Sequence, residues 1–133
     1  IMIPLLISAI AAALLIPRAH APLAPPAPLC AEELPARLTA PHIFHLALQA
    51  GFPLPVAQRM TQIAMRESDG DPRAVNFRGD DYSWGLWQIN VRKRIWLEWR
   101  GLSHPEQLLN PTINARAAHK LWSAYGLKPW DKR

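Results

Sequence analysis

The chain has 133 residues, and its 15 Lys and Arg outnumber its 10 Asp and Glu to give a formal net charge of +5 at pH 7. This length leaves room for one small domain and a tail. The single cysteine, Cys30, excludes an intramolecular disulfide and a cysteine-rich metal site. We expect neither a cofactor nor a bound metal ion.

The N-terminal segment, residues 1–21, is predominantly apolar. Residues 1–17 contain no charged side chain, and the run ends in Ala19-His20-Ala21, the small-x-small pattern of a signal peptidase site. The segment therefore predicts an export signal, a retained membrane anchor or a buried assembly segment. An anchor would be short, because about 17 residues of helix reach only about 25 Å.

Residues 22–38 read as a linker, because four prolines fall within the eight residues from Pro22 to Leu29. From Thr39 we expect the folded domain, residues 39–133. A short helix from Pro41 to Gly51 opens it, with proline in the first turn and glycine as the C-terminal cap. Its two histidines have no further ligand nearby, which indicates a solvated edge rather than a metal site.

A second helix begins at Pro55 and ends at the Asp69–Pro72 turn. Its apolar residues recur at the spacing of one helix face: Val56, Met60, Ile63 and Ala64. Glu67 continues this stripe in the last turn. A partly desolvated carboxyl group favours its protonated form, which is the form that a general acid needs. The alternative is a rim position with an ion pair to Arg59, Arg66 or Arg73.

A polar loop leads to Gly85-Leu86-Trp87-Gln88-Ile89-Asn90, where aromatic residues crowd around Gly85. Aromatic rings can hold sugars by stacking or fill a core, and we expect Trp87 in the core and Tyr82 more exposed. Gln88 and Asn90 carry amides that both donate and accept hydrogen bonds. The polar loop itself lacks the register of a calcium site.

The stretch Val91–Arg100 is basic, with Trp96 and Trp99 interleaved, which is a pattern compatible with nucleic acid. It is short and isolated, so nucleic acid is not the partner we expect. The positive charge equally suits anionic cell-wall polymers or a phospholipid surface.

A final helix is predicted from Asn110 as N-cap and Pro111 at the first position, with Gly126 after its end. One stripe of this helix includes Asn114 and Tyr125.

Four elements in order carry a family resemblance. They are Glu67-Ser68, the loop Asp71–Asn76, Gly85-Leu86-Trp87-Gln88 and the Asn110–Ala115 segment. Together they resemble the soluble lytic transglycosylase domain of the lysozyme-like superfamily and, more distantly, goose-type lysozyme. The resemblance covers Pro41 to Trp130. It implies a mainly α fold, a small lysozyme-like helical domain preceded by the apolar segment and the proline-rich linker.

The resemblance implies cleavage of the β-1,4 bond between N-acetylmuramic acid and N-acetylglucosamine in peptidoglycan. Glu67 would be the catalytic acid and then the base, with the acetamido group of the sugar assisting. The residues that would bind the glycan strand are Ser68, Tyr82, Gln88, Asn90, Asn114 and Tyr125. Asn114 matches a family asparagine that is structural or substrate-facing. The later Ala-Tyr-Asn-Ala-Gly element of the family is missing, and Tyr125-Gly126 with Pro129-Trp130 are candidates to replace it.

Two alternatives stay open. If Asp80 or Asp81 faces Glu67 across the sugar site, the protein would be a lysozyme-type hydrolase with two carboxylates. The chain could also be a structural component of a phage particle or an envelope-spanning secretion machine. We expect the protein in the periplasm or cell envelope, or in a virion that delivers it there, with residues 1–17 in contact with a membrane.

Overall fold

The structure is a computed structural model, and it describes residues 34–92 and 101–131. The predicted apolar segment 1–21, the start of the linker and both tryptophans of the basic stretch lie outside the described residues. No helix within the described ranges is long and apolar enough to cross a membrane. Leu38 is already buried and donates its N–H to the Gly70 carbonyl at 2.7 Å. The predicted boundary between residues 38 and 39 stays a prediction.

Helix α1 (Ala40–Ala50) begins and ends as its sequence predicts. The Thr39 side chain accepts a hydrogen bond from the His42 N–H, which satisfies one free donor of the first turn. Gly51 ends the helix with φ of 103°, a left-handed conformation that glycine adopts without steric cost. Ile43 and Ala47 are the buried residues of α1 and face the core.

Helix α2 (Leu54–Ser68) packs against α1 and ends at Asp69, which has φ of 53°. Its buried residues are Ala57, Met60, Ile63, Ala64 and Ser68. Val56, which the predicted stripe included, is only half-buried. The buried face is thus centred about one residue later than the spacing predicted, because the packing partner α1 fixes which side of α2 is covered.

Three two-residue strands follow: β1 (Val75–Asn76), β2 (Ser83–Trp84) and β3 (Ile89–Asn90). They form an antiparallel sheet in the order β1-β2-β3, with Val75 opposite Trp84 and Trp84 opposite Ile89. The sequence analysis did not predict this sheet, because strands of two residues are too short to show an alternating pattern.

The chain continues through the short helix η2 (Pro105–Leu109), α4 (Pro111–Tyr125) and η3 (Lys128–Trp130). Asn110 caps α4, since its Oδ1 accepts from the N–H groups of Thr112 at 2.9 Å and Ile113 at 3.2 Å. The predicted N-cap and first-turn proline are confirmed.

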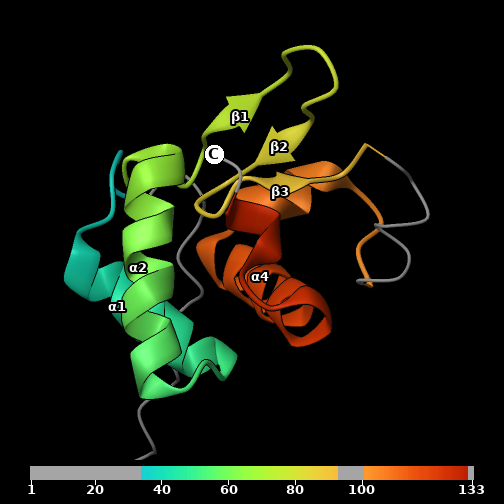
Figure 1. Cartoon of the computed structure of the whole chain (residues 1–133). Coiled ribbons are helices and arrows are strands. Elements are labelled where there is room, and N and C mark those ends of the chain that lie inside the picture. The colour runs from blue at the N-terminus through green and yellow to red at the C-terminus, as the bar shows by residue number, and fades with distance from the viewer. Residues whose placement is uncertain (1–33, 93–100, 132–133) are drawn as a thin grey trace, which may run out of the picture.

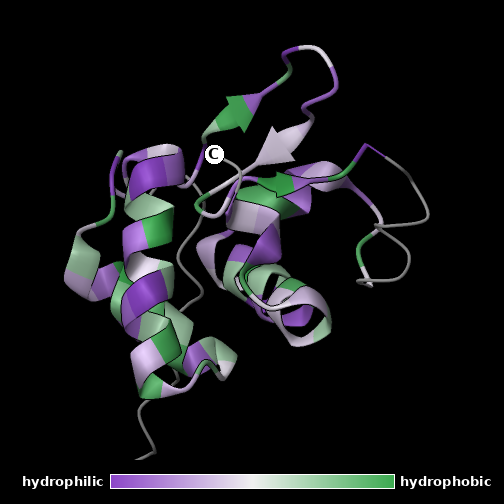
Figure 2. Cartoon of the chain, in the orientation of Figure 1, coloured by the Kyte–Doolittle hydropathy of each residue, from purple (hydrophilic) through white to green (hydrophobic). Residues whose placement is uncertain are grey.

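The three α-helices of the described ranges surround one core, and the sheet lies at the end of α2 where that helix terminates (Figure 1). Figure 2 shows hydrophilic and hydrophobic residues alternating around α2 and α4, as expected for helices with one buried face. Trp87 and Leu86 are completely buried between helices and sheet. The mainly α fold class is confirmed.

Candidate active site

Glu67 lies in the last turn of α2, and its side chain is only 6% exposed. Its Oε1 accepts a hydrogen bond from Arg66 Nη2 at 3.0 Å. The structure therefore combines a feature of each sequence interpretation. The Glu67 carboxyl group is shielded from water, and it is also paired with a neighbouring arginine. Arg59, another of the proposed partners, instead donates to Gln62 at 3.1 Å.

Arg66 connects Glu67 to the end of the described chain. The same Nη2 atom donates to the Trp130 carbonyl at 2.8 Å. The Trp130 indole N–H donates to the Trp87 carbonyl at 2.9 Å, and the Trp87 indole N–H donates to the Met60 carbonyl at 2.8 Å. Because Met60 and Arg66 both belong to α2, these bonds form a closed circuit that fixes η3 against α2. Sequence reasoning missed Arg66 as a bridge, because its second partner is 64 residues away.

The Gly85–Gln88 turn is fixed to the middle of α2, where the Trp87 indole N–H donates to the Met60 carbonyl. Gly85 has φ of 75°, and a Cβ there would collide with Asn114 Nδ2 and the Leu108 carbonyl, so only glycine fits. Gln88 has φ of 47° and is largely buried. Its Nε2 donates to the carbonyls of Gly85 at 3.0 Å and Ala74 at 3.1 Å. Within the described ranges its Oε1 accepts no hydrogen bond, which leaves an acceptor on this predicted substrate-binding residue.

Asn114 is completely buried and holds this turn in place. Its Nδ2 donates to the carbonyls of Trp84 and Leu108, both at 2.9 Å, and its Oδ1 accepts from the Trp87 N–H at 3.0 Å. Every polar atom of the amide is therefore bonded to backbone. Of the two predicted roles for Asn114, the structure favours the structural one.

Ser68 and Asn90 are also engaged by the protein. The Ser68 hydroxyl is buried and donates to the Ala64 carbonyl at 2.9 Å, one helical turn earlier. Asn90 donates from Nδ2 to Asp81 at 3.4 Å, and its Oδ1 accepts from the Arg92 N–H at 3.1 Å. These contacts position backbone and loop, and the substrate-binding role of the two side chains stays a prediction.

The Asp81 carboxylate accepts hydrogen bonds from residues of all three strands. It accepts from Asn76 Nδ2 of β1 at 2.8 Å, from the Ser83 hydroxyl of β2 and from Asn90 of β3. These three contacts hold the side chain in one position. Asp80, by contrast, is exposed and pairs with Arg92 at 2.7 Å.

The aromatic residues separate as predicted. Trp87 is completely buried, whereas Tyr82 is 42% exposed. The Tyr82 ring lies 4.6 Å from the ring of Phe77, which is 55% exposed. Sequence reasoning passed over Phe77, although a phenylalanine in an otherwise polar loop was the observation that could have drawn attention to it.

Tyr125 is 58% exposed and lies at the last residue of α4. It shares the helix stripe of Asn114 but not its environment, because the end of α4 extends past the core. With Lys128, Pro129 and Asp131 it lines a cavity of about 500 Å³ beside η3. This places it near the segment that Arg66 contacts.

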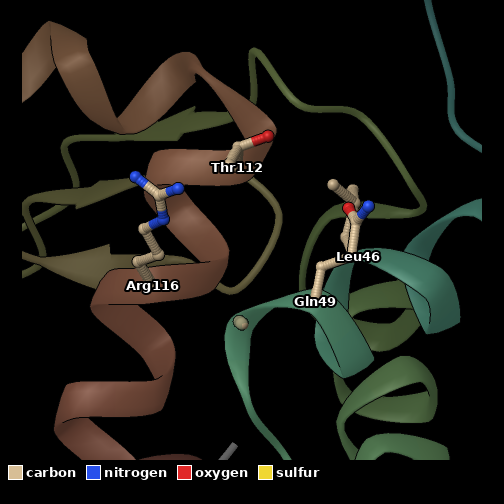
Figure 3. A pocket seen from close by; sticks show the side chains of 5 residues that line it. Leu46, Gln49, Thr112 and Arg116 are labelled. Atoms are coloured by element: carbon tan, nitrogen blue, oxygen red, sulfur yellow. The ribbon is translucent and has the colours of Figure 1, made fainter.

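A separate cavity of about 440 Å³ lies between α1 and α4. Figure 3 shows Thr112 and Arg116 of α4 on one side, and Leu46 and Gln49 of α1 on the other. None of the predicted site residues lines it. Within the described ranges, no group of three His, Cys, Asp or Glu side chains could hold a metal ion.

The comparisons agree with this architecture. Residues 44–132, two thirds of the chain, match the family described as the lysozyme-like domain, and the chain belongs to that family. No curated protein and no solved structure matches the chain. Family membership makes the protein a peptidoglycan-cleaving enzyme of the glycosidase type.

Proposed function

We propose that the protein is a lytic transglycosylase that cleaves the β-1,4 bond between N-acetylmuramic acid and N-acetylglucosamine, with Glu67 as its one catalytic carboxyl group. The observation that carries the proposal is the contrast between the acidic side chains. Glu67 is nearly buried beside Arg66, whereas Asp81 is engaged by three strands and Asp80 by Arg92. With Glu67 as the one catalytic carboxyl group, the substrate itself must supply the nucleophiles. A reaction that uses the acetamido oxygen and then the 6-hydroxyl of the muramyl residue meets this requirement.

In the first step protonated Glu67 donates its proton to the glycosidic oxygen, and the bond from that oxygen to C1 of the muramyl residue breaks. The acetamido oxygen of the muramyl residue bonds to C1 in its place. In the second step the Glu67 carboxylate takes the proton of the muramyl 6-hydroxyl, and the oxygen of that hydroxyl bonds to C1 as the bond from C1 to the acetamido oxygen breaks. This step gives a 1,6-anhydro product and restores the acetamido group. The Arg66 guanidinium, 3.0 Å from Oε1, stabilises the carboxylate that the first step produces.

Substrate contacts are proposed for Gln88, Tyr82 and Tyr125. The unused Oε1 of Gln88 suits a sugar amide or hydroxyl donor, and the exposed rings of the tyrosines suit sugar faces. Ser68, Asn90 and Asn114 would support these contacts by holding the backbone of the site. We propose the cell envelope as the place of action, reached by export or by delivery from a virion.

The test is mass spectrometry of the soluble fragments that the full chain releases from purified peptidoglycan, compared with its Glu67→Gln variant. We expect anhydromuramyl ends from the unmutated protein and at least a thousandfold slower release from the variant, roughly the contribution of a general acid and base together. Retention of the melting temperature in Glu67→Gln is the control for folding. Undiminished release by Glu67→Gln would exclude Glu67 as the acid.

One observation favours a muramidase as the second candidate. Asp81 is a carboxylate held in one position just before the central strand β2, as a second carboxylate in a hydrolase would be. Reducing muramyl ends, lost in Asp81→Asn but retained in Asp80→Asn, would support this alternative. No release by the unmutated chain would instead indicate a structural role in a phage or secretion assembly.

A further inference from the structure

Two adjoining cavities on the exposed side of α4 share one arginine and lie apart from the proposed catalytic residues. The cavity of about 440 Å³ between α1 and α4 and a second cavity of about 330 Å³ are both lined by Arg116. We propose that the two cavities, called the Arg116 groove below, bind an acidic stem peptide of peptidoglycan. The inference rests on the proposed action on peptidoglycan and adds a peptide site to it.

Arg116 supplies the charge at the centre of the groove. In Figure 3 the side chains of Thr112 and Arg116 stand on the α4 side of the larger cavity, and those of Leu46 and Gln49 stand on the α1 side. Among the described residues, no hydrogen bond or ion pair engages Arg116, and no Asp or Glu lines either cavity. A carboxylate that enters the groove would therefore pair with the guanidinium, whose planar fork can donate two hydrogen bonds to it.

A row of polar side chains gives the groove its length. Thr112, Arg116 and Lys120 follow one another at intervals of four residues, so they lie in line along the exposed face of α4. The row is about 12 Å long, which about four residues of an extended peptide cover. Two cations within this length suit a short peptide that carries more than one carboxylate.

The walls of the groove are apolar and partly buried. Leu46 and Ala50 of α1 line the larger cavity, and Leu102 and Ile113 line the other. Such walls accommodate short apolar side chains. They also exclude water from an ion pair at Arg116, which makes the pair stronger than one on an open surface. The amide of Gln49 adds a donor and an acceptor for a peptide backbone.

This combination favours a peptide over the other anions of a cell envelope. A flat phospholipid surface does not enter a recessed groove, and a polyphosphate chain would leave the apolar walls without contacts. A stem peptide carries carboxylates and alanine methyl groups on a flexible backbone, so it can use both the charge and the walls.

The groove is separate from the catalytic carboxyl group. Glu67 lies in the last turn of α2, whereas the larger cavity lies between α1 and α4, and none of the predicted site residues lines either cavity. A stem peptide bound at Arg116 therefore leaves Glu67 free to act on a glycan. Peptide-bearing peptidoglycan should accordingly bind more tightly than peptide-free glycan strands.

The test is calorimetric titration of the full chain with free stem peptides, released from purified peptidoglycan by an amidase. We expect Arg116→Gln to weaken binding roughly tenfold, as the loss of a hydrogen bond to a charged group does. Arg116 is exposed, so this variant should keep the fold, which its melting temperature checks. Ala50→Gln narrows the larger cavity without changing the charge and should also weaken binding.

The matched control is Arg59→Gln. It removes the same charge from an exposed position on α2 that lines neither cavity, and it should leave binding unchanged. Fragment release gives a second readout. Arg116→Gln should raise KM severalfold for peptide-bearing peptidoglycan and leave KM for peptide-free strands unchanged.

Equal affinities of Arg116→Gln and Arg59→Gln for stem peptides would overturn the inference, and so would an unmutated chain that binds no stem peptide. A loss of polyphosphate binding in Arg116→Gln, with stem-peptide binding retained, would mean that the groove recognises phosphate instead of peptide. If the unmutated chain binds stem peptides through Arg116 but releases no fragments, the proposed activity fails while the Arg116 groove stands.

Discussion

The carboxyl group of Glu67 is shielded from water and also held in place. Arg66 contacts Glu67 and the Trp130 carbonyl with one nitrogen atom, at 3.0 Å and 2.8 Å. A guanidinium anchored on both sides fixes the direction in which the carboxylate points. At a proton-transfer site, an error of about 1 Å in such a position can cost roughly a hundredfold in rate.

Arg66→Gln therefore should lower the rate of fragment release by roughly tenfold to a hundredfold, with the same products. The measurement is the initial rate of release from purified peptidoglycan. Arg59→Gln is the control, because Arg59 lies on the same helix and, among the described residues, its side chain donates to Gln62. Equal rates for the two variants would show that Arg66 does not position Glu67.

Asn114 is the residue on which the Gly85–Gln88 turn depends. Asn114→Ala leaves the carbonyls of Trp84 and Leu108 and the N–H of Trp87 without their partner. Since each buried unpaired group costs about 1 to 3 kcal/mol, we expect a loss of at least about 3 kcal/mol in the free energy of unfolding. Urea denaturation measures it. Arg116→Ala, an exposed change on the same helix, should cost less than about 0.5 kcal/mol.

At the scale of elements, η3 closes the domain. Trp130 is buried, and its indole N–H reaches the Trp87 carbonyl while its own carbonyl accepts from Arg66. After α4, the short helix η3 therefore links the sheet turn to α2 through its tryptophan. That Tyr125-Gly126 with Pro129-Trp130 replace the missing family element stays a prediction.

Trp130→Phe keeps an aromatic ring but removes the bond to the Trp87 carbonyl. We expect a loss of about 1 kcal/mol or more from the hydrogen bond, with a further contribution from lost ring area. The measurement is thermal unfolding, with Trp122→Phe as the control for lost ring area. Within the described residues the Trp122 indole donates no hydrogen bond, so that variant loses ring area alone. A melting temperature of Trp130→Phe equal to that of Trp122→Phe would contradict the role assigned to this contact.

At the scale of the molecule, the charge of +5 acts on a substrate that carries carboxylate groups. Exposed charges act over about 10 Å at 0.1 M salt and over about 3 Å at 1 M salt. The attraction therefore steers the enzyme to the wall without choosing the bond that is cleaved.

Raising the salt concentration from 0.05 M to 0.5 M should raise KM for peptidoglycan about tenfold and leave kcat nearly constant. The measurement is fragment release at both salt concentrations. Uncharged chitin-type oligosaccharides are the control ligand and should bind equally well at both. A salt-independent KM would mean that long-range charge does not contribute to recognition.

Local chemistry made the helices predictable. Gly51, Asp69 and Asn110 end or begin helices through their own conformations and side-chain bonds, so the sequence alone located those boundaries to within a residue. The same local pattern singled out Glu67 at the end of a buried stripe.

Contacts between segments that are distant in the sequence decided the surroundings of the individual side chains. The bond from Arg66 to Trp130, the backbone contacts of Asn114 and the three donors on Asp81 all depend on how the elements pack. Tyr125 shows the limit most clearly: its spacing from Asn114 predicts the same helix face, yet one residue is buried and the other exposed. Periodicity determines the direction of a side chain from its helix axis, whereas only the tertiary structure determines whether another element lies in that direction.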